Sequence, residues 1–374
     1  MTTTGPEPPA EPSPDPLSLL LADHTIVVCT GSGGVGKTTT AAVMAMEAAR
    51  QGRRACVVTI DPARRLANAM GLDGLTDSAS LVAGDWPGEL WALMLDTKTT
   101  FDALVTQNAS DAQQAESILN NRFYRNISTA LSGTQEYMAM EKLYELHHDE
   151  RFDVIVVDTP PTRNALDFLE APGRLTRFLD HRLYKLLITP TRGLARAMNV
   201  AAQAFLRTVS RVIGREVVTD LVEFFTAFDG MEQGFKDRAA KVVELLSAPE
   251  TAFVLVTAPR RDVVEEASFF AEKLDEAGIP VRALIVNRVH PHFSAERPAA
   301  VAARADEHAG TALGELYANL ADFTSVASTE DAHLVGLSGR VAPAPVVKVP
   351  FLGSDVHDVD GLDRIAEHLF ATTT

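Results

Sequence analysis

Short apolar runs alternate with longer amphipathic stretches over most of this chain. The runs are rich in Val, Ile and Leu and end at Gly, Pro or Asp, as the buried strands of a parallel sheet do. They lie at residues 25–30, 54–60, 90–95, 152–157, 252–257, 281–286 and 346–349. Most of the stretches between them have helical patterns, and this alternation is typical of a doubly wound α/β fold. The pattern therefore predicts a mostly parallel sheet flanked by helices.

Two intervals, residues 97–149 and 163–249, are too long to be simple crossovers and contain few strand signals. Their patterns are helical, and we interpret them as one α-helical subdomain inserted into the sheet. The sheet and its insert would form a single domain over residues 17–374. Residues 1–16 are rich in Pro, Glu and Thr and lack the basic start of a signal peptide, which predicts a disordered tail.

Two sets of apolar residues repeat at helical spacing within the predicted insert. The first set contains Leu183, Leu186, Leu187, Leu194, Met198, Phe205, Val209, Val212 and Ile213, and the second contains Phe224, Phe225, Phe228, Met231 and Phe235. These residues either pack against one another as a core or form an apolar groove for a client helix, to which Met and Phe side chains are suited. Periodicity alone does not tell which stripe is exposed, and we favour a core.

The composition is that of an ordinary globular protein, with 374 residues of which 46% are hydrophobic. A formal net charge of −16 disfavours nucleic acid and anionic lipid surfaces as partners. Because no apolar run approaches the length that spans a membrane, we expect no stable membrane insertion. The two cysteines, Cys29 and Cys56, fall in predicted strands, which argues against a disulfide framework and favours a reducing, cytoplasmic location.

A glycine-rich loop follows the first predicted strand and precedes an Ala- and Met-rich helical run at residues 39–50. The loop fits G-x-x-x-x-G-K-[ST], the phosphate-binding sequence of P-loop NTPases. Glycines let backbone N–H groups surround the phosphates, while Lys37 reaches the β and γ phosphates and Thr38 offers its hydroxyl to Mg²⁺. A glycine-rich turn without a ligand would need neither side chain. The predicted nucleotide-binding residues are Gly33, Gly34, Val35, Gly36, Lys37, Thr38 and Thr39.

Acidic residues follow two of the other predicted strands. Asp158 ends the run at residues 152–157, in the arrangement by which a Walker B strand orients Mg²⁺, and we predict that Asp158 and Thr38 hold the metal. Asp61 follows the run at residues 54–60 and precedes Pro62. A carboxylate beside the phosphates can orient and polarise the attacking water, but an Asp before Pro is also a common capping residue. The residues alone leave both roles of Asp61 open.

These motifs together resemble one known family. The segments concerned are 33–39, 61–63 (Asp-Pro-Ala), 158–162 (Asp-Thr-Pro-Pro-Thr), 286–288 (Val-Asn-Arg) and 349–352 (Val-Pro-Phe-Leu). They look like the ArsA and tail-anchored-protein-targeting (guided entry) ATPases, over nearly the whole chain after residue 17, and in particular like an actinobacterial-type member. The resemblance implies a P-loop α/β domain with a helical insert that acts as a nucleotide-gated dimer, with ATP and Mg²⁺ as cofactors.

The resemblance also implies roles for single residues. Asp61 would belong to switch I and position the attacking water, and the segment 158–162 would be switch II. Asn287 would recognise the adenine. The loop from Pro350 to Asp355, which includes Phe351, would close over the base.

The chain departs from the family pattern inside the glycine-rich loop. The family has a second lysine at the position held here by Ser32, and that lysine reaches the phosphates of the partner subunit. A short, uncharged hydroxyl cannot stabilise charge in this way. We therefore predict a heterodimer with a related subunit that retains the lysine. The alternative is a homodimer with Arg64, Arg65 or Arg163 as the cation.

Other departures bear on metals and substrates. Arg163-Asn164-Ala165 replaces the Gly-His-Thr of the family's switch II, so coupling to the insert is expected to differ. The Cys-x-x-Cys zinc clip of the targeting branch is absent, and we expect His290 and His292 to be solvated and to bind no zinc. Arsenite sensing needs three soft thiolates, which two buried cysteines cannot supply.

The leading hypothesis is an Mg²⁺-dependent ATPase that switches a dimer and its helical insert for a client or partner protein. The alternative is a regulatory subunit that binds ATP with little turnover, because Ser32 removes a cation. An arsenite-pump ATPase and a partitioning ATPase rank last. Partitioning ATPases often have a basic C-terminal helix, whereas Leu362 to Phe370 contains two acids and one Arg.

Overall fold

The computed structural model describes residues 15–60, 65–125, 134–159, 171, 173, 176–177, 215–353, 355–356 and 358–370. Within them the strands are β1 (Ile26–Thr30), β2 (Arg54–Thr59), β3 (Ser80–Leu81), β4 (Glu89–Met94), β5 (Val154–Asp158), β6 (Thr251–Thr257), β7 (Val281–Val289) and β8 (Val346–Pro350). They form one sheet in the order β3-β4-β2-β5-β1-β6-β7-β8. Only the β3–β4 pair is antiparallel. The predicted strands and the mostly parallel α/β sheet are confirmed, and β3 was not predicted because two residues show no periodicity.

The first strand lies inside the sheet, between β5 and β6. After β1 the chain passes through helix α2 (Lys37–Arg50) to β2 on one side of β1, whereas β6 lies on the other side. The strand order therefore reverses beside β1. In open α/β sheets ligands bind in the crevice outside the carboxyl ends of the strands at such a point.

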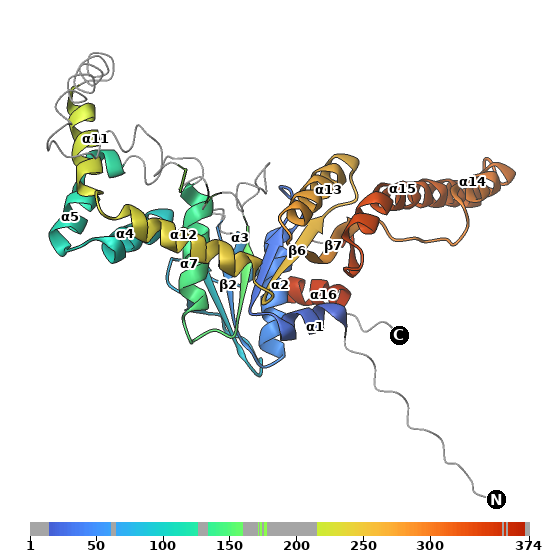
Figure 1. Cartoon of the computed structure of the whole chain (residues 1–374). Coiled ribbons are helices and arrows are strands. Elements are labelled where there is room, and N and C mark those ends of the chain that lie inside the picture. Colours follow the sequence, from blue (N-terminus) through green and yellow to red (C-terminus); the bar gives the residue numbers. More distant parts are fainter. Residues whose placement is uncertain are drawn as a thin grey trace, which may run out of the picture.

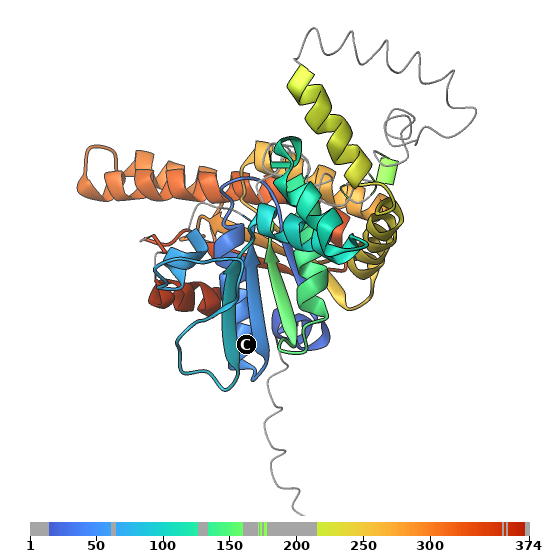
Figure 2. The same ribbon diagram turned by 90° about the vertical axis from the view of Figure 1, so that its left-hand side faces the viewer.

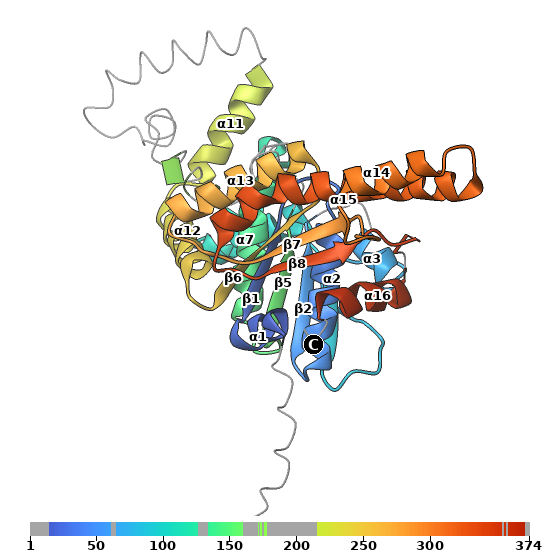
Figure 3. The same ribbon diagram turned by 90° about the vertical axis from the view of Figure 1, so that its right-hand side faces the viewer.

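Helices that share one buried apolar cluster cover one face of the sheet (Figures 1 and 3). They are α1 (Pro16–Asp23), α2, α3 (Arg65–Ala69) and α16 (Val359–Leu369). Val27, Val57 and Val156 point to this side from three neighbouring strands and are fully buried. The side chain of Asp15 caps α1 through the backbone N–H groups of Leu17 and Ser18, and the tail predicted for residues 1–16 stays a prediction. Residues 1–14 lie outside the described part.

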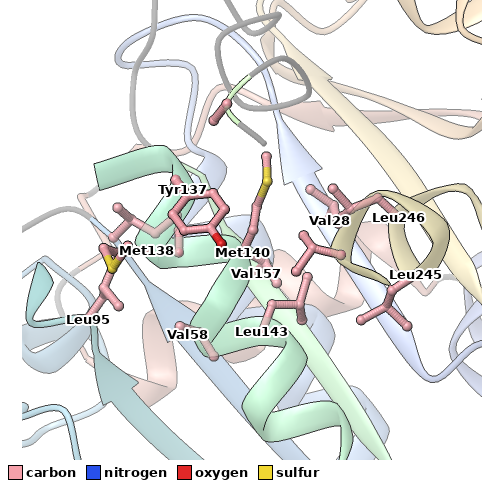
Figure 4. Packing of buried hydrophobic residues seen from close by; sticks show 14 of the residues in the cluster. Val28, Val58, Leu95, Tyr137, Met138, Met140, Leu143, Val157, Leu245 and Leu246 are labelled. Atoms are coloured by element: carbon pink, nitrogen blue, oxygen red, sulfur yellow. The ribbon is translucent and has the colours of Figure 1, made fainter. Parts of the chain in front are cut away.

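The opposite face is formed by the alternate strand residues, because successive side chains of a strand point to opposite sides. Val28, Val58 and Val157 lie here and are buried. Figure 4 shows Met140 and Leu143 of α7 (Thr134–His147) packed over these valines. The sheet is thus buried on both faces, which is why its strands read as continuous apolar runs.

The helices of the predicted insert pack around an aromatic cluster. Those described are α4 (Thr97–Asn108), α5 (Ala112–Asn120), α7, α11 (Arg215–Ala227) and α12 (Glu232–Ser247). The ring centroids of Phe228 and Phe235 lie 4.9 Å apart, and those of Phe101 of α4 and Phe235 lie 6.4 Å apart. The whole stripe of Phe224, Phe225, Phe228, Met231 and Phe235 is buried. It is therefore core, as we favoured, whereas the stripe at residues 183–213 lies outside the described residues and the domain boundaries stay a prediction.

Three further helices are α13 (Arg261–Glu276), α14 (Pro298–Glu307) and α15 (Ala312–Val341). Figures 2 and 3 show that α14 and the first half of α15 form a hairpin that extends well beyond the sheet. The second half of α15 is anchored by Leu334 and Leu337, which are buried in the core next to α13 and β7. In the part of the chain that the structure describes, no helix is long and apolar enough to span a bilayer.

Candidate functional site

The loop between β1 and α2 is shaped by close contacts with other backbone and side-chain atoms. Gly31 and Gly36 have φ angles of 149° and 99°. A Cβ atom at Gly31 would lie 2.0 Å from the carbonyl oxygen of Val256, and one at Gly36 would lie 2.2 Å from Nδ2 of Asn287. Only glycine fits both positions. Gly36 is also the N-cap of α2, so the free N–H groups of its first turn and the positive end of its dipole suit a phosphate at this loop.

Lys37 is the first residue of α2 and is buried. Its Nζ atom donates a hydrogen bond to the carbonyl oxygen of Ser32 at 2.8 Å, so the ammonium group lies inside the loop. Burial, together with the Asp158 carboxylate, raises the pKa of the Cys29 thiol beneath the loop, while Lys37 acts to lower it. The site thus places a cation and a carboxylate near the end of β1, and Cys29 remains a neutral thiol.

Asp158, the last residue of β5, accepts hydrogen bonds from two hydroxyl groups. Thr38 Oγ1 donates to Asp158 Oδ2 at 2.7 Å, and Thr59 Oγ1 donates to the same oxygen at 2.8 Å. The register of the sheet produces this arrangement, because Asp158 pairs with Thr59 of β2 and with Cys29 of β1. The Asp158 side chain is almost fully buried. Thr59 therefore fixes the carboxylate that faces the start of α2.

The ligands gathered around Thr38 suit one kind of metal ion. Hydroxyl and carboxylate oxygens are hard donors that favour Mg²⁺, which keeps several waters and needs few protein ligands. Among the described residues there is no group of three or more His, Cys, Asp or Glu side chains that could hold a metal. The pair of Thr38 and Asp158 fits an ion that takes its other ligands from water and phosphate oxygens.

A cleft of about 530 Å³ opens beside the glycine-rich loop. Its lining comes from the loop and the start of α2, the ends of β7 and β8, the segment after β8, and α16. The residues are Gly36, Thr39, Asn287, Arg288, Pro350, Phe351, Leu352, Asp355, Val356 and Ile365. A volume of this order is typical of sites for small ligands and cofactors. Five residues that the sequence predicted to bind nucleotide line this single cleft, namely Gly36, Thr39, Asn287, Pro350 and Phe351.

The end of β7 is held against the glycine-rich loop. Asn287 Nδ2 donates to the carbonyl oxygen of Val35 at 2.9 Å, and Asn287 Oδ1 accepts the backbone N–H of Arg288 at 2.9 Å. Arg288 has φ 61°, and its Nη1 donates to the carbonyl oxygen of Gly34 at 3.3 Å. Asn287 therefore supports the loop, and its predicted contact with adenine stays a prediction.

The cleft is also connected to α15. The ring of Phe351 stacks on His290, with ring centroids 6.0 Å apart and planes 6° from parallel. His290 Nδ1 lies 2.7 Å from Glu330 Oε1 of α15, and its backbone N–H donates to Glu330 Oε2 at 2.9 Å. His292 lies 2.7 Å from Asp331, which also accepts from Lys348 at 2.6 Å. Both histidines were expected to be solvated, whereas each lies against a carboxylate of α15, since a loop pattern does not reveal a partner helix.

Most of the remaining predicted residues of the switch regions lie outside the described part of the chain. Asp61 and Arg64 lie outside the described residues, as do residues 160–170, so the roles assigned to Asp61, Arg163 and switch II stay predictions. Arg65 is exposed at the start of α3. Sequence reasoning missed Thr59 and Arg288. The rule that polar residues at strand ends face the ligand could have found Thr59, whereas the left-handed conformation of Arg288 has no local sequence signal.

Comparisons with known proteins identify the family of this chain. The family described as "Anion-transporting ATPase" (ArsA_ATPase) matches residues 24–329. The "Arsenical pump-driving ATPase" of Acidiphilium multivorum is 27% identical, over 90% of this chain and 53% of its own length. "ATPase GET3B" of Arabidopsis thaliana is 28% identical, over 71% of this chain and 64% of its own length. "ATPase GET3" of Malassezia globosa is 24% identical, over 92% of this chain and 90% of its own length. The chain thus covers about half of the arsenical pump relative and less than two thirds of GET3B.

Proposed function

We propose, from the premise that this chain belongs to the family of anion-transporting ATPases, that it binds ATP with Mg²⁺ and hydrolyses the phosphoanhydride bond to the γ-phosphate. One observation supports this above the others. Thr38 and Asp158, from elements 120 residues apart in sequence, meet at 2.7 Å directly beside Lys37 and the glycine-rich loop. Hydroxyl, carboxylate and ammonium groups at one helix N-terminus are the set that a metal-bound polyphosphate requires.

Different residues of the chain would bind the phosphates, the metal ion and the base. The backbone N–H groups of residues 33–39 and the Lys37 ammonium hold the phosphates. Thr38 and Asp158 would hold Mg²⁺, which supplies charge stabilisation to the phosphates when it is bound. Thr59 keeps the Asp158 carboxylate oriented toward Thr38. Asn287, Pro350 and Phe351 would hold the base in the cleft.

Asp61 is proposed to position the attacking water. An Asp61→Asn variant should then bind MgATP but hydrolyse it slowly, because an amide cannot accept the proton or polarise the water in the same way. Single-turnover hydrolysis, together with titration calorimetry of MgATP binding, separates the two steps. An Asp61→Asn variant with the wild-type rate would show that this residue is only a cap before Pro62.

The experiment that tests the proposed function compares two carboxylates at opposite ends of one strand. Asp158→Asn should lose Mg²⁺-dependent hydrolysis. Asp153→Asn, which alters an exposed carboxylate that pairs with Arg54 before β5, should retain it. Calorimetry with MgATP on the wild-type chain, alone and with its natural companions, is the prior requirement. If no binding is measured in either case, the proposal is wrong.

We also propose that the working unit is a dimer that changes state with ATP and so acts on a client or partner protein. Ser32 favours a heterodimer with a lysine-bearing relative, because its side chain is short, uncharged and buried. A homodimer with Arg64, Arg65 or Arg163 as the cation is the other arrangement. Native mass spectrometry decides between them, since a stable homodimer with full activity removes the need for a partner subunit.

A second candidate function follows from the same residue. Ser32 stands where the family has its second lysine. If no other cation takes the place of that lysine, the chain would bind ATP as a regulatory subunit with little turnover. Hydrolysis by the isolated chain, compared with a Ser32→Lys variant, tests this. Strong activity of the unmodified chain excludes the regulatory role. The two buried free thiols disfavour an arsenite pump and support a reducing, cytoplasmic location.

A further inference from the structure

We propose that Arg288 is a phosphate-binding residue of this site and supplies a positive charge at the rim of the glycine-rich loop. The inference rests on the proposed function, because it assigns the guanidinium group to the bound nucleotide. It goes beyond the predicted set, in which Lys37 is the sole cation of the chain's own loop.

The backbone of Arg288 is held in an unusual conformation. Among the described residues it is the only non-glycine residue with a positive φ, at 61°. The pairing of β7 with β8 shifts register between Val286 and Val289, so the strand bulges at this residue. The Asn287 side chain accepts the Arg288 N–H at 2.9 Å and thereby fixes the bulge. Conformations of this kind are sparsely populated by non-glycine residues and cluster at functional sites.

The bulge places the Arg288 side chain beside the loop. Nη1 donates to the carbonyl oxygen of Gly34 at 3.3 Å, and Arg288 also lines the cleft that contains Thr39 and Asn287. A Cβ atom built on Gly34 would meet nothing within 4 Å, so there is open space next to this residue of the loop. The guanidinium group therefore lies where it can reach the phosphate oxygens of a nucleotide held by the loop.

The electrostatic surroundings of Arg288 suit an anionic ligand. Many described arginines are paired with carboxylates, namely Arg50, Arg54, Arg151, Arg238, Arg260, Arg261, Arg304 and Arg340. Arg288 is exposed, and its guanidinium has one neutral carbonyl as hydrogen-bond partner in the described part of the chain. A guanidinium has five donors, and its bonds to phosphate are stronger than a bond to a carbonyl. The chain as a whole has a net charge of −16, so a positive group at this rim offsets repulsion of the nucleotide.

Calorimetry of MgATP binding to four variants tests the assignment. Arg288→Ala and Arg288→Gln should each weaken MgATP binding by about tenfold or more, as expected for a lost charge-assisted contact of about 1.4 kcal/mol or more. Arg288→Lys should stay within a few fold of the wild type. Arg282→Ala removes an exposed arginine at the start of the same strand and is the matched control, which should bind as the wild type does. The loss in the Arg288 variants should shrink in high salt, because salt screens exposed charges.

The Gln variant separates charge from support of the loop, because its amide can still donate to Gly34. If Arg288→Gln binds MgATP as well as the wild type, Arg288 only supports the loop and the proposal is wrong. Equal binding by all the variants is also a refutation. Absence of MgATP binding by the wild-type chain is a different result, since it removes the proposed function itself.

Discussion

Removing the Thr59 hydroxyl is the most informative change at the proposed metal site, because it alters the surroundings of Asp158 and leaves the glycine-rich loop unchanged. Thr59 and Thr38 both donate to Asp158 Oδ2, at 2.8 Å and 2.7 Å. If Thr38 turns its hydroxyl oxygen to Mg²⁺, the Thr59 hydroxyl still donates to this oxygen of Asp158. Thr59→Val keeps the shape of the side chain and removes the hydrogen bond.

The size of the effect follows from the charge of the acceptor. A hydrogen bond to a charged group contributes about 1.5–3 kcal/mol, and each 1.4 kcal/mol is about a tenfold change in an equilibrium constant. We therefore expect the Mg²⁺ concentration for half-maximal hydrolysis to rise about 10- to 100-fold in Thr59→Val. ATP binding measured without Mg²⁺ should change little, since Thr59 is not part of the loop.

The matched control is Thr251→Val, at the opposite end of the sheet. Thr251 is also buried on a strand and donates at 2.7 Å, but its acceptor is the neutral carbonyl of Leu245. It should lose about 1 kcal/mol of unfolding free energy in a urea titration and keep the wild-type Mg²⁺ dependence. If Thr59→Val loses stability but needs no more Mg²⁺ than the wild type, Thr59 is a structural residue and the reasoning fails.

Two further substitutions test the loop and the aromatic cluster, and a labelling experiment tests a buried thiol. Gly36→Ala should lower MgATP affinity at least about tenfold, since a left-handed alanine costs about 1–2 kcal/mol and its Cβ displaces Asn287. The control is Gly52→Ala, where φ is 85° and the surrounding space is open, and this variant should bind MgATP as the wild type does. Phe235→Ala should lower the unfolding free energy by about 3–5 kcal/mol in urea, and a loss under 1 kcal/mol would contradict its place in the core. Burial raises the pKa of Cys56 from 9.0 to about 12. The Cys56 thiol therefore ionises at a lower pH in the unfolded chain than in the folded one, and the free energy of unfolding falls as pH rises from 9 toward 12. A thiol reagent at pH 8 should label Cys56 only after denaturant is added.

The strands of the sheet could be predicted because they are buried on both faces. A run such as residues 252–257 is apolar up to Thr257 at its end, and β6 extends over it with one extra residue at its start. The glycine-rich loop was equally clear, since Gly31 and Gly36 have no tolerable substitute where they lie. Strand burial and the glycine positions depend on the residues of one short segment, so both can be predicted from a single sequence.

Contacts between distant segments could not be predicted in the same way. Thr59 meets Asp158 only through the register of β2 on β5, and Arg288 reaches Gly34 only through a bulge in β7. The amphipathic pattern of α15 shows one apolar side but not that its first half leaves the sheet. Exposed Leu316 and Phe323 on that half read in sequence like core residues.

Because Glu330 and Asp331 hold α15 against the segment that follows β7, the outer part of the helix is a long arm attached beside the cleft. The arm from Ala312 to Glu330 is about 27 Å long at about 1.5 Å per residue. A tilt of about 10° at this attachment would sweep its far end through about 5 Å. A small displacement of the stacked Phe351 and His290 rings that tilted α15 would thus produce a larger displacement at Ala312, well away from the cleft.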